Sequence, residues 1–231
     1  MVGSPTTSCH TISMLATDAQ RQQLLELFHK GTKLRYDKGE FIIRSGETPS
    51  GVFYIEEGLV KAYDITKYGE ENLLIIRKPR EIFPLIWGVT GTERHVVYQT
   101  LAPTTVWRIS RKSLEEYIHT PGCSLSPLLD MTVEMYRIHS ERIINLEYRT
   151  VRERLISFLL TMAGRFGQEC ADGICINVPL RQQDIASSIN SSRETTSREI
   201  SALEKRKLIA NSPQGIVLRD LEKLQSFLQV S

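Results

Sequence analysis

The sequence predicts an α+β protein with an N-terminal antiparallel β-roll (a jelly roll), one long central helix and a C-terminal winged helix-turn-helix. Three observations support this prediction. Short β-rich runs alternate with glycines from Lys33 to Ser110. A long helical pattern covers Ser126 to Tyr148. The remaining chain follows the order strand, helix, very short turn, helix and hairpin, which is the order of a winged helix-turn-helix.

The composition is that of an ordinary globular protein, and the distribution of charge adds one hint. The chain has 231 residues, of which 41% are hydrophobic and 24% are charged. The net charge of +2 is too small to indicate a partner. Residues 149–231 carry 12 Lys/Arg against 9 Asp/Glu, which gives +3, whereas residues 1–148 carry 17 against 18. A mildly basic C-terminal part permits binding to nucleic acid without requiring it.

The chain shows no targeting or membrane signal. The start, MVGSPTTSCHTISML, has neither a basic region nor a long apolar run. No apolar stretch approaches the roughly 18 residues of a spanning helix. We therefore expect a cytoplasmic protein without a membrane partner.

Four cysteines are present, and their spacing does not indicate a metal site. They are Cys9, Cys123, Cys170 and Cys175. None forms a Cys-x-x-Cys pair, and no histidine lies at metal-ligand spacing beside them. We expect reduced thiols, with a redox-sensing pair of Cys170 and Cys175 as the alternative.

The N-terminal region is read as strands and turns framed by two short helices. Asp18 is a candidate cap for a helix that runs through Phe28. The strand candidates lie in GEFIIRSGE, GVFYIEEG, VKAYDITKYGEENLLII and TVWRIS. TKYGEE resembles a hairpin tip in which Gly69 supplies a positive φ. Residues 111–119 form a short helix that TPG ends.

Two apolar stripes run along the long helix at residues 126–148. One stripe is Leu128, Met131, Met135, Ile138 and Arg142, and the neighbouring one is Leu129, Tyr136, Ile143 and Leu146. Two stripes on one helix serve two contacts, with its own domain and with a second copy of the chain. The alternative is a helix buried within a monomer.

The C-terminal segments meet the requirements of a winged helix-turn-helix. VRERLISFLLTMAGRFG is a helix that stops at Gly167, GICINVPL is a strand, and LIANSPQGIVLRD is a hairpin that turns at 213–215. LRQQDIASSIN and SRETTSREISALEKRK are the two helices between them. The residues assigned to the motif are Ala186 for close packing, Ile185 and Ile189 for the core, Asn190 for a left-handed turn, and Ile200 and Leu203 as anchors. Ser191 and Glu194 form a candidate capping box.

The outward side of the second helix carries groups that can read DNA bases. Arginine pairs with the O6 and N7 atoms of guanine, and a carboxylate accepts from N4 of cytosine. Arg193, Glu194 and Arg198 can therefore read G, C and G, with Thr196 or Ser197 beside them. Ser192 and Thr195 can hold phosphates at the positive end of the helix. The capping box and cytosine compete for Glu194. The alternative interpretation of the trio is a solvated, salt-bridged helix face.

The segment SSRETTSREISALEKRKLI resembles the recognition helix of the cyclic-AMP receptor/fumarate-nitrate regulator (CRP/FNR) superfamily of bacterial transcription factors. KGEFIIRSGETPSGVFYIEEGLVKAY resembles the opening of the family's β-roll, and residues 126–148 correspond to its dimerising helix. The resemblance covers nearly the whole chain. The family's Arg-Glu-x-x-x-Arg reader falls on Arg193, Glu194 and Arg198, and it typically prefers TGTGA-like inverted half-sites.

The resemblance implies a division of labour along the chain. Residues 1–125 form an effector-sensing β-roll, 126–148 the dimerisation helix, and 149–231 the DNA-binding domain. It implies a homodimer, double-stranded promoter DNA and RNA polymerase as partners, and allosteric control by a small effector. Ser191 and Gln183 are included among the expected DNA contacts.

The effector pocket departs from the cyclic-nucleotide pattern. Cyclic-nucleotide members carry a Gly-Glu pair for the ribose and an Arg-Ser pair for the phosphate, where this sequence has Pro84-Leu85 and Arg94-His95. Leucine accepts no hydrogen bond from a ribose, and proline has no backbone donor. We therefore expect an effector other than cyclic AMP. The expected apolar lining is Phe83, Leu85 and Val97, and the expected polar anchors are Arg94, His95, His139 and Ser140. This lining suits a small anionic or aromatic ligand.

Several alternatives remain at the level of the sequence. Arg94 can instead form a structural ion pair with Glu93 or another acid, and the histidines can be ordinary surface or core-edge residues. Only Cys9 lies near the N-terminus, so no iron-sulfur cluster is expected, and no ligand pattern supports haem. A cupin-type metal enzyme is the alternative from another class, but the β region offers only His95 as a ligand. A ligand-independent regulator of the same family is the third reading.

Overall fold

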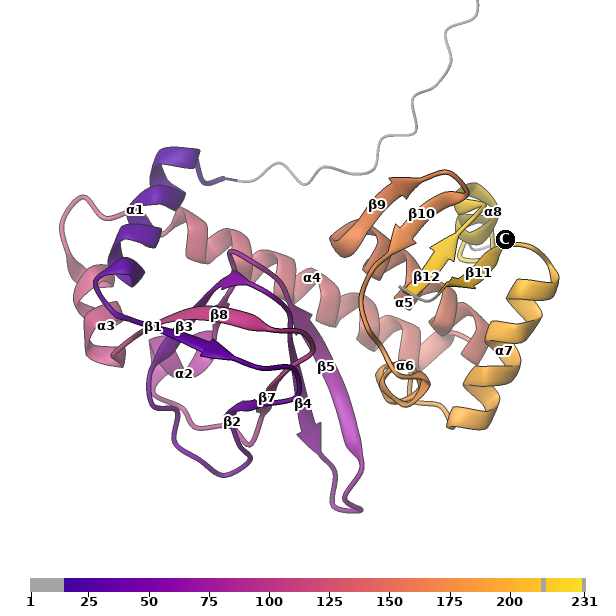
Figure 1. Cartoon of the computed structure of the whole chain (residues 1–231), viewed down its shortest axis with the longest axis horizontal. Helices are drawn as coiled ribbons and strands as arrows, with labels where there is room; N and C mark the ends of the chain where they lie inside the picture. The colour runs from indigo at the N-terminus through magenta and orange to yellow at the C-terminus, as the bar shows by residue number, and fades with distance from the viewer. Residues whose placement is uncertain (1–14, 213–214, 230–231) are drawn as a thin grey trace, which may run out of the picture.

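A β-roll and a smaller C-terminal domain lie side by side in the computed structural model, and the long helix α4 (Ser126–Tyr148) runs along both (Figure 1). The structure describes residues 15–212 and 215–229. The expectations for Cys9 and the rest of residues 1–14, and for the 213–214 part of the hairpin turn, lie outside the described residues. The predicted α+β class and the order of its parts are confirmed.

Two four-stranded antiparallel sheets form the β-roll. In spatial order, the first sheet contains β1 (Thr32–Tyr36), β8 (Thr104–Ile109), β3 (Val52–Glu57) and β6 (Ile82–Phe83). The second contains β2 (Phe41–Ile43), β7 (Val97–Thr100), β4 (Val60–Ile65) and β5 (Glu71–Arg77). The predicted hairpin tip between β4 and β5 is confirmed, and Gly69 there has φ +80°, which glycine adopts without steric penalty.

Three short helices pack around the roll, and the first begins differently from the prediction. They are α1 (Asp18–His29), α2 (Leu85–Thr90) and α3 (Arg111–His119). The cap of α1 is Thr17, whose side chain accepts a hydrogen bond from the Gln20 N–H at 3.3 Å. The prediction of Asp18 as the cap is therefore wrong by one residue. Asp18 lies in the first turn, where its charge still complements the helix dipole.

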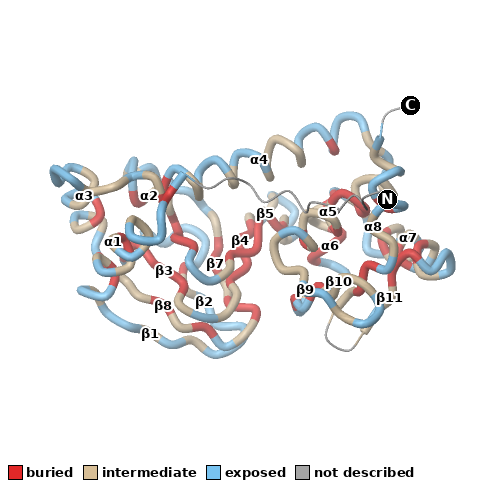
Figure 2. Tube along the Cα trace, turned by 90° about the horizontal axis from the view of Figure 1, so that it is seen from above, coloured by how far each residue is buried: buried red, intermediate tan, exposed pale blue. Residues whose placement is uncertain are grey.

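The two stripes of α4 have different surroundings. Leu128 and Met131 pack against the core between α1, α2 and α3, and Met135 and Ile138 pack against the interior of the roll. The other stripe, which contains Leu129, Tyr136 and Ile143, remains exposed in the single chain. Figure 2 shows this helix along one side of the molecule with much of its outer surface exposed. The inner stripe thus packs on its own domain, as predicted.

The C-terminal domain is built on α5 (Val151–Phe166), α6 (Gln182–Ser188), α7 (Arg193–Lys205) and α8 (Leu221–Ser226). Its antiparallel sheet has the order β11 (Ile209–Ser212), β12 (Gly215–Leu218), β10 (Gly173–Ile176) and β9 (Gly167–Cys170). Its hydrophobic core includes Leu73 and Ile76 of β5. The core of the C-terminal domain therefore extends onto the β5 edge of the roll, while the rest of the roll is packed around two other clusters.

A disulfide joins Cys170 and Cys175 across the β9–β10 hairpin, with the two Cα atoms 6.0 Å apart. The expectation of reduced thiols is wrong for this pair, whereas Cys123 is free. The register places Cys175 opposite Val217 of β12 and leaves β9 at the sheet edge. A pairing of this kind depends on hairpin register, which cysteine spacing alone does not give.

The junction between the domains is formed by an edge strand. β5 lies at the end of its sheet, and an edge strand presents unpaired backbone groups that need other partners. The N–H of Leu73 donates to Ser187 Oγ of α6 at 3.2 Å. The Leu73 carbonyl accepts from Arg142 of α4, and the Ile76 carbonyl accepts from Arg165 of α5, each at 2.8 Å. Side chains from three helices thus satisfy the free edge of the roll.

Buried charges reinforce the same junction. The amino group of Lys61, only 4% exposed, lies 2.6 Å from Glu71 and 3.7 Å from Asp184 of α6. Arg181 bridges the same two carboxylates, at 2.9 Å from each. Burial acts to raise the pKa of Asp184, but hydrogen bonds from Arg181 and the charge of Lys61 outweigh it and lower that pKa below its usual value. Asp184 is therefore charged in the folded protein at neutral pH.

Within residues 15–212 and 215–229, no helix combines the length and the apolar character that crossing a membrane requires.

Candidate DNA-binding surface and effector site

The turn between α6 and α7 has the geometry that the sequence predicts. Asn190 adopts φ +50°, which lies in the left-handed region that asparagine tolerates. Ala186 is fully buried, and its carbonyl accepts a hydrogen bond from the Ser191 N–H at 3.0 Å. Arg154 of α5 donates to the Asn190 carbonyl at 3.3 Å. The buried residues Ile185, Ile189, Ile200 and Leu203 confirm the predicted inward face.

The cap of α7 is Ser192, and the predicted box of Ser191 and Glu194 is wrong. Ser192 Oγ accepts from the Thr195 N–H at 3.1 Å, whereas Ser191 Oγ donates only to the Ser192 carbonyl at 3.5 Å. The Ser191 N–H is hydrogen-bonded back to α6 after the left-handed turn, so α7 has its cap one residue later, at Ser192. Glu194 then occupies the second position of the helix and takes no part in the cap.

This assignment predicts a difference between two adjacent serines. Removing an N-cap side chain costs about 1 kcal/mol of stability, and up to about 2 kcal/mol. We expect Ser192→Ala to lower the free energy of unfolding by about 1 kcal/mol and Ser191→Ala to change it by only a few tenths. Urea denaturation followed by circular dichroism measures both variants. Equal losses, or a larger loss for Ser191→Ala, would contradict the cap.

The N-terminal half of α7 exposes Arg193, Glu194 and Arg198. None of the three takes part in an ion pair with another described residue. Arg198 donates to Thr195 Oγ1 at 3.0 Å, which holds its guanidinium toward the start of the helix. The alternative of a salt-bridged surface therefore does not describe this face. These groups are available for a partner, and their chemistry matches guanine and cytosine edges.

The opposite side of α7 is fixed to the protein. Glu199 accepts from Arg152 of α5 at 2.6 Å, and Ile200 and Leu203 enter the core. The sequence left open whether Thr196 or Ser197 faces outward beside the arginines. Thr196 is fully buried and Ser197 is half-buried, so only Ser197 can do so. The surface of α7 that carries Arg193, Glu194 and Arg198 is thus opposite a surface that packs firmly against the domain.

The remaining predicted DNA contacts surround the start of α7. Ser192 is exposed, and Ser191 and Thr195 are half-buried. Gln183 is exposed in the first turn of α6, while its neighbours Asp184 and Ile185 are buried. The wing is the β11–β12 hairpin, whose two strands pair from Ile209 with Leu218 to Ser212 with Gly215. Ser192 and Gln183 are thus exposed in the two helices of the motif, and the role of these residues in DNA contact stays a prediction.

The predicted effector residues do not all converge. Phe83 is fully buried inside the roll, with ring centroids 5.3 Å from Phe53 and 4.8 Å from Tyr98. Leu85 begins α2 and packs in the separate core beneath α1 and α3. The predicted apolar wall of Phe83 and Leu85 is therefore wrong, because both side chains are engaged in different cores. Val97 is also buried.

The polar part of the predicted site lies where β7 approaches α4. Arg94 and His95 are exposed in the segment before β7, and His139 and Ser140 are half-buried on α4. Glu93 accepts from Thr48 at 2.6 Å, and among the described residues Arg94 has no ion-pair partner. The alternative of a Glu93–Arg94 pair is thus not supported.

Cations surround His139. Its pKa is lowered by burial first, and then by the charges of Arg142, Arg77, Arg94 and Arg165. Burial raises the pKa of Tyr98, which Arg77 and Arg94 oppose. Of these four arginines, Arg77 and Arg165 also pair with Glu81, whereas Arg94 and Arg142 have no ion-pair partner among the described residues. Sequence reasoning missed Arg77, which follows an apolar run. No local pattern distinguishes a buried arginine at that place from an exposed arginine that ends a strand.

The shift at His139 predicts an acid-sensitive step in stability. Because its pKa is lower folded than unfolded, the unfolded chain binds more protons below about pH 6.5, and the free energy of unfolding falls as pH drops. We expect His139→Gln to reduce the loss of stability between about pH 7.5 and pH 5.5. Urea titrations at both pH values, at one protein concentration, measure it. The exposed His119→Gln serves as the control, and an equal change in both variants would contradict the assignment.

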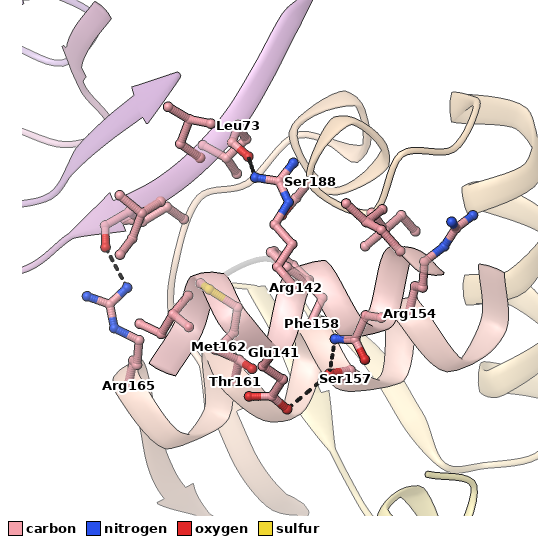
Figure 3. Close-up of a pocket in the computed structure, with 17 residues that line it drawn as sticks. Leu73, Glu141, Arg142, Arg154, Ser157, Phe158, Thr161, Met162, Arg165 and Ser188 are labelled. Carbon is pink, nitrogen blue, oxygen red and sulfur yellow. Dashed lines mark hydrogen bonds between the residues drawn. The ribbon is translucent and has the colours of Figure 1, made fainter. Parts of the chain in front are cut away.

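A cleft that sequence reasoning missed lies between the domains (Figure 3). Its walls come from β5, α4, α5 and the end of α6. No signal in the sequence indicates it, because its walls come from segments far apart in the chain that meet only when the two domains dock.

Comparison with known proteins identifies both domains. Residues 33–120 match the cyclic nucleotide-binding domain, and residues 153–227 match the Crp-like helix-turn-helix domain. The global nitrogen regulator of Nostoc sp. is 29% identical over 182 residues, which cover 76% of this chain and 79% of that protein. The transcriptional activator protein anr of Pseudomonas aeruginosa is 24% identical over 212 residues, 92% of this chain and 85% of that protein.

Solved structures agree in fold. A CooA mutant from Carboxydothermus hydrogenoformans superposes with a TM-score of 0.75 at 22% identity, covering 92% of this chain and 97% of that one. FixK2 from Bradyrhizobium japonicum gives a TM-score of 0.73 at 24% identity, with 87% and 98% coverage.

These matches favour a regulator over an enzyme, so the cupin-type alternative has no support. In the described part of the chain, no group of three or more His, Cys, Asp or Glu side chains could hold a metal ion. With its matched sensor fold, long helix and helix-turn-helix, the chain belongs to the CRP/FNR family of DNA-binding transcription regulators.

Proposed function

We propose that the protein is a homodimeric regulator that binds a palindromic, TGTGA-like promoter site and is controlled by a small anionic effector other than cyclic AMP. The observation that carries the proposal is the unpaired, exposed trio of Arg193, Glu194 and Arg198 at the start of α7. With the cap on Ser192, Glu194 can accept from cytosine while both arginines donate to guanine. Ser192 and Gln183 are exposed, and they are proposed as phosphate contacts.

The exposed stripe of α4 supports the homodimer. Leu129, Tyr136 and Ile143 recur every seven residues, and Val133 and Ser140 fall between them, which is the spacing of a coiled-coil seam. Leu129, Val133, Tyr136 and Ile143 are 49%, 50%, 75% and 58% exposed, so each has much apolar surface left to bury. A two-fold seam here would present two copies of α7 to two half-sites.

The charges of Arg94 and Arg142, which both act on His139 and have no ion-pair partner among the described residues, support an anionic effector. Arg94, His139 and Ser140 are proposed as its contacts, and Pro84 with Leu85 removes the groups that would hold a ribose. The proposal keeps the division into residues 1–125 for sensing, 126–148 for dimerisation and 149–231 for DNA binding. RNA polymerase is the partner that a promoter-bound regulator would contact.

Selection from a random DNA pool tests the proposal. We expect enrichment of an inverted repeat whose half-sites are centred about one helical turn, roughly 34 Å, apart. Footprinting of the enriched site should protect both halves. Protection of one half-site, or no enrichment, would contradict a dimeric reader.

The effector is tested separately. We expect cyclic AMP to leave both the melting temperature and DNA affinity unchanged, and an anionic metabolite to stabilise the folded protein by mass action. Arg94→Gln should remove that stabilisation. Full DNA affinity in the purified protein, unaffected by any metabolite tested, would instead favour the ligand-independent alternative.

A further inference from the structure

The interdomain cleft has a volume of about 70 Å³ and walls contributed by both domains. Leu73 and Ile76 come from β5, and Phe158 and Met162 come from α5, so most of its surface is apolar. Figure 3 shows Arg142, Arg154 and Arg165 around it, and the Arg165 guanidinium meets a backbone carbonyl at one side. The cleft is thus an apolar space ringed by guanidinium groups.

Two of these guanidinium groups have no counter-ion among the described residues. Arg142 donates only to uncharged oxygens, the Leu73 carbonyl and Asn72 Oδ1, each at 2.8 Å. Arg154 donates to the Asn190 carbonyl, and neither arginine forms an ion pair with any described residue. A cation withdrawn from water is costly unless an anion pairs with it. Within the described part of the chain, the half-buried Arg142 therefore has no anion of the kind that normally pairs with such a charge.

The acids nearest the cleft are already engaged. Glu141 lies on its wall but is 3.3 Å from Arg137 and accepts from Ser157 at 3.3 Å. Glu81 pairs with Arg165 at 2.6 Å and with Arg77 at 3.6 Å. The described residues thus supply no free carboxylate for Arg142.

Buried polar atoms without partners line the same cleft. They are Nε of Arg142, Arg154 and Arg165, together with Oδ1 of Asn145. The side chain of Arg165 is 5% exposed, and Asn145 is 9% exposed. Buried polar atoms in native proteins almost always have a hydrogen-bond partner. These atoms are hydrogen-bonding groups that a molecule bound in the cleft can meet.

We propose that the cleft is a binding site for a short-chain organic carboxylate. The carboxylate would accept from the Nε side of Arg142, and the short carbon chain would lie against Phe158 and Met162. Because about 10–15 Å³ suffices for one water molecule, the cleft has room for about five or six non-hydrogen atoms. This is the size of propionate, butyrate or lactate.

This site differs from the effector site proposed at Arg94 and His139. Its walls include β5, α5 and α6, so a ligand there touches both the sensor and the DNA-binding domain. A carboxylate on Arg142 Nε would bind the same guanidinium whose NH1 group donates to the Leu73 carbonyl of the β5 edge. Such a ligand can change DNA affinity only if it binds one arrangement of the two domains more tightly than another.

Butyrate is the probe, and its neutral isostere butyramide is the control. We expect butyrate to bind saturably in isothermal titration, at constant ionic strength and without DNA, while butyramide binds at least tenfold more weakly. Arg142→Gln should weaken butyrate at least tenfold, and Arg94→Gln should not. Thr161→Phe, which fills the cleft without removing charge, should also abolish binding if Arg142→Gln fails to fold.

Three outcomes would overturn the proposal. Butyrate and butyramide could bind alike or not at all, which would exclude a carboxylate site. Thr161→Phe could bind butyrate as the wild type does, which would place the ligand elsewhere. Arg94→Gln, rather than Arg142→Gln, could lose binding, which would assign butyrate to the effector site. Because no DNA is present, failure here leaves the proposed DNA-binding function untouched, and failure of the DNA experiments leaves this site untouched.

Discussion

Arg193→Ala is expected to abolish selectivity for the palindromic site while leaving salt-sensitive binding to random DNA. Arg193 is exposed at the first position of α7 and has no ion pair with another described residue, so its side chain is free to meet a guanine. One bidentate guanine contact contributes about 1–3 kcal/mol of discrimination. A dimer loses two such contacts, so affinity for the palindrome should fall about 30-fold or more.

The matched control is Arg206→Ala, which removes the same charge at the C-terminal end of α7. Fluorescence anisotropy compares the selected palindrome with a scrambled duplex at several salt concentrations. Arg193→Ala should weaken only the palindrome strongly, because phosphate contacts carry no sequence information. Equal weakening on both duplexes would show that Arg193 binds backbone. A similar loss in Arg206→Ala would show that net charge, not base reading, matters.

The helix-turn-helix could be read from the sequence because its demands are local. A small residue at Ala186, a left-handed residue at Asn190 and an apolar pair at Ile200 and Leu203 lie within a few turns of one another. The cap was missed for an equally local reason. Ser191 and Ser192 both suit a cap, and the spacing rule selects Ser191 because Glu194 follows three residues later. The hydrogen bond from Ser191 N–H to the Ala186 carbonyl decides against it.

The sensor end could not be read in the same way because its chemistry depends on packing between distant segments. Phe83 lies in a plausible pocket segment, yet stacking with Phe53 and Tyr98 places it in the core. Arg142 was assigned to the inward stripe of α4, but its role depends on β5 being an edge strand with a free carbonyl at Leu73. Neither the edge nor the cleft exists until both domains have folded against α4.

Tyr136→Glu is expected to convert the proposed dimer into a monomer. Tyr136 is 75% exposed and lies at the middle of the heptad stripe between Leu129 and Ile143. In a two-fold seam each residue at this position faces the matching region of the partner, so the substitution brings two carboxylates together in a desolvated contact. Sedimentation velocity at micromolar concentration should then give a mass near 26.4 kDa rather than twice that value.

The control is Tyr68→Glu, because Tyr68 is 77% exposed in the β4–β5 turn and equals Tyr136 in chemistry and exposure. Its variant should remain dimeric with unchanged DNA affinity. The Tyr136→Glu monomer should keep its circular dichroism spectrum, because that side chain contributes little to the single chain's core. It should bind a single half-site as the wild type does. Its affinity for the palindrome should fall at least tenfold, because the two copies of α7 are no longer linked in one dimer. A Tyr136→Glu protein that stays dimeric would move the interface away from α4.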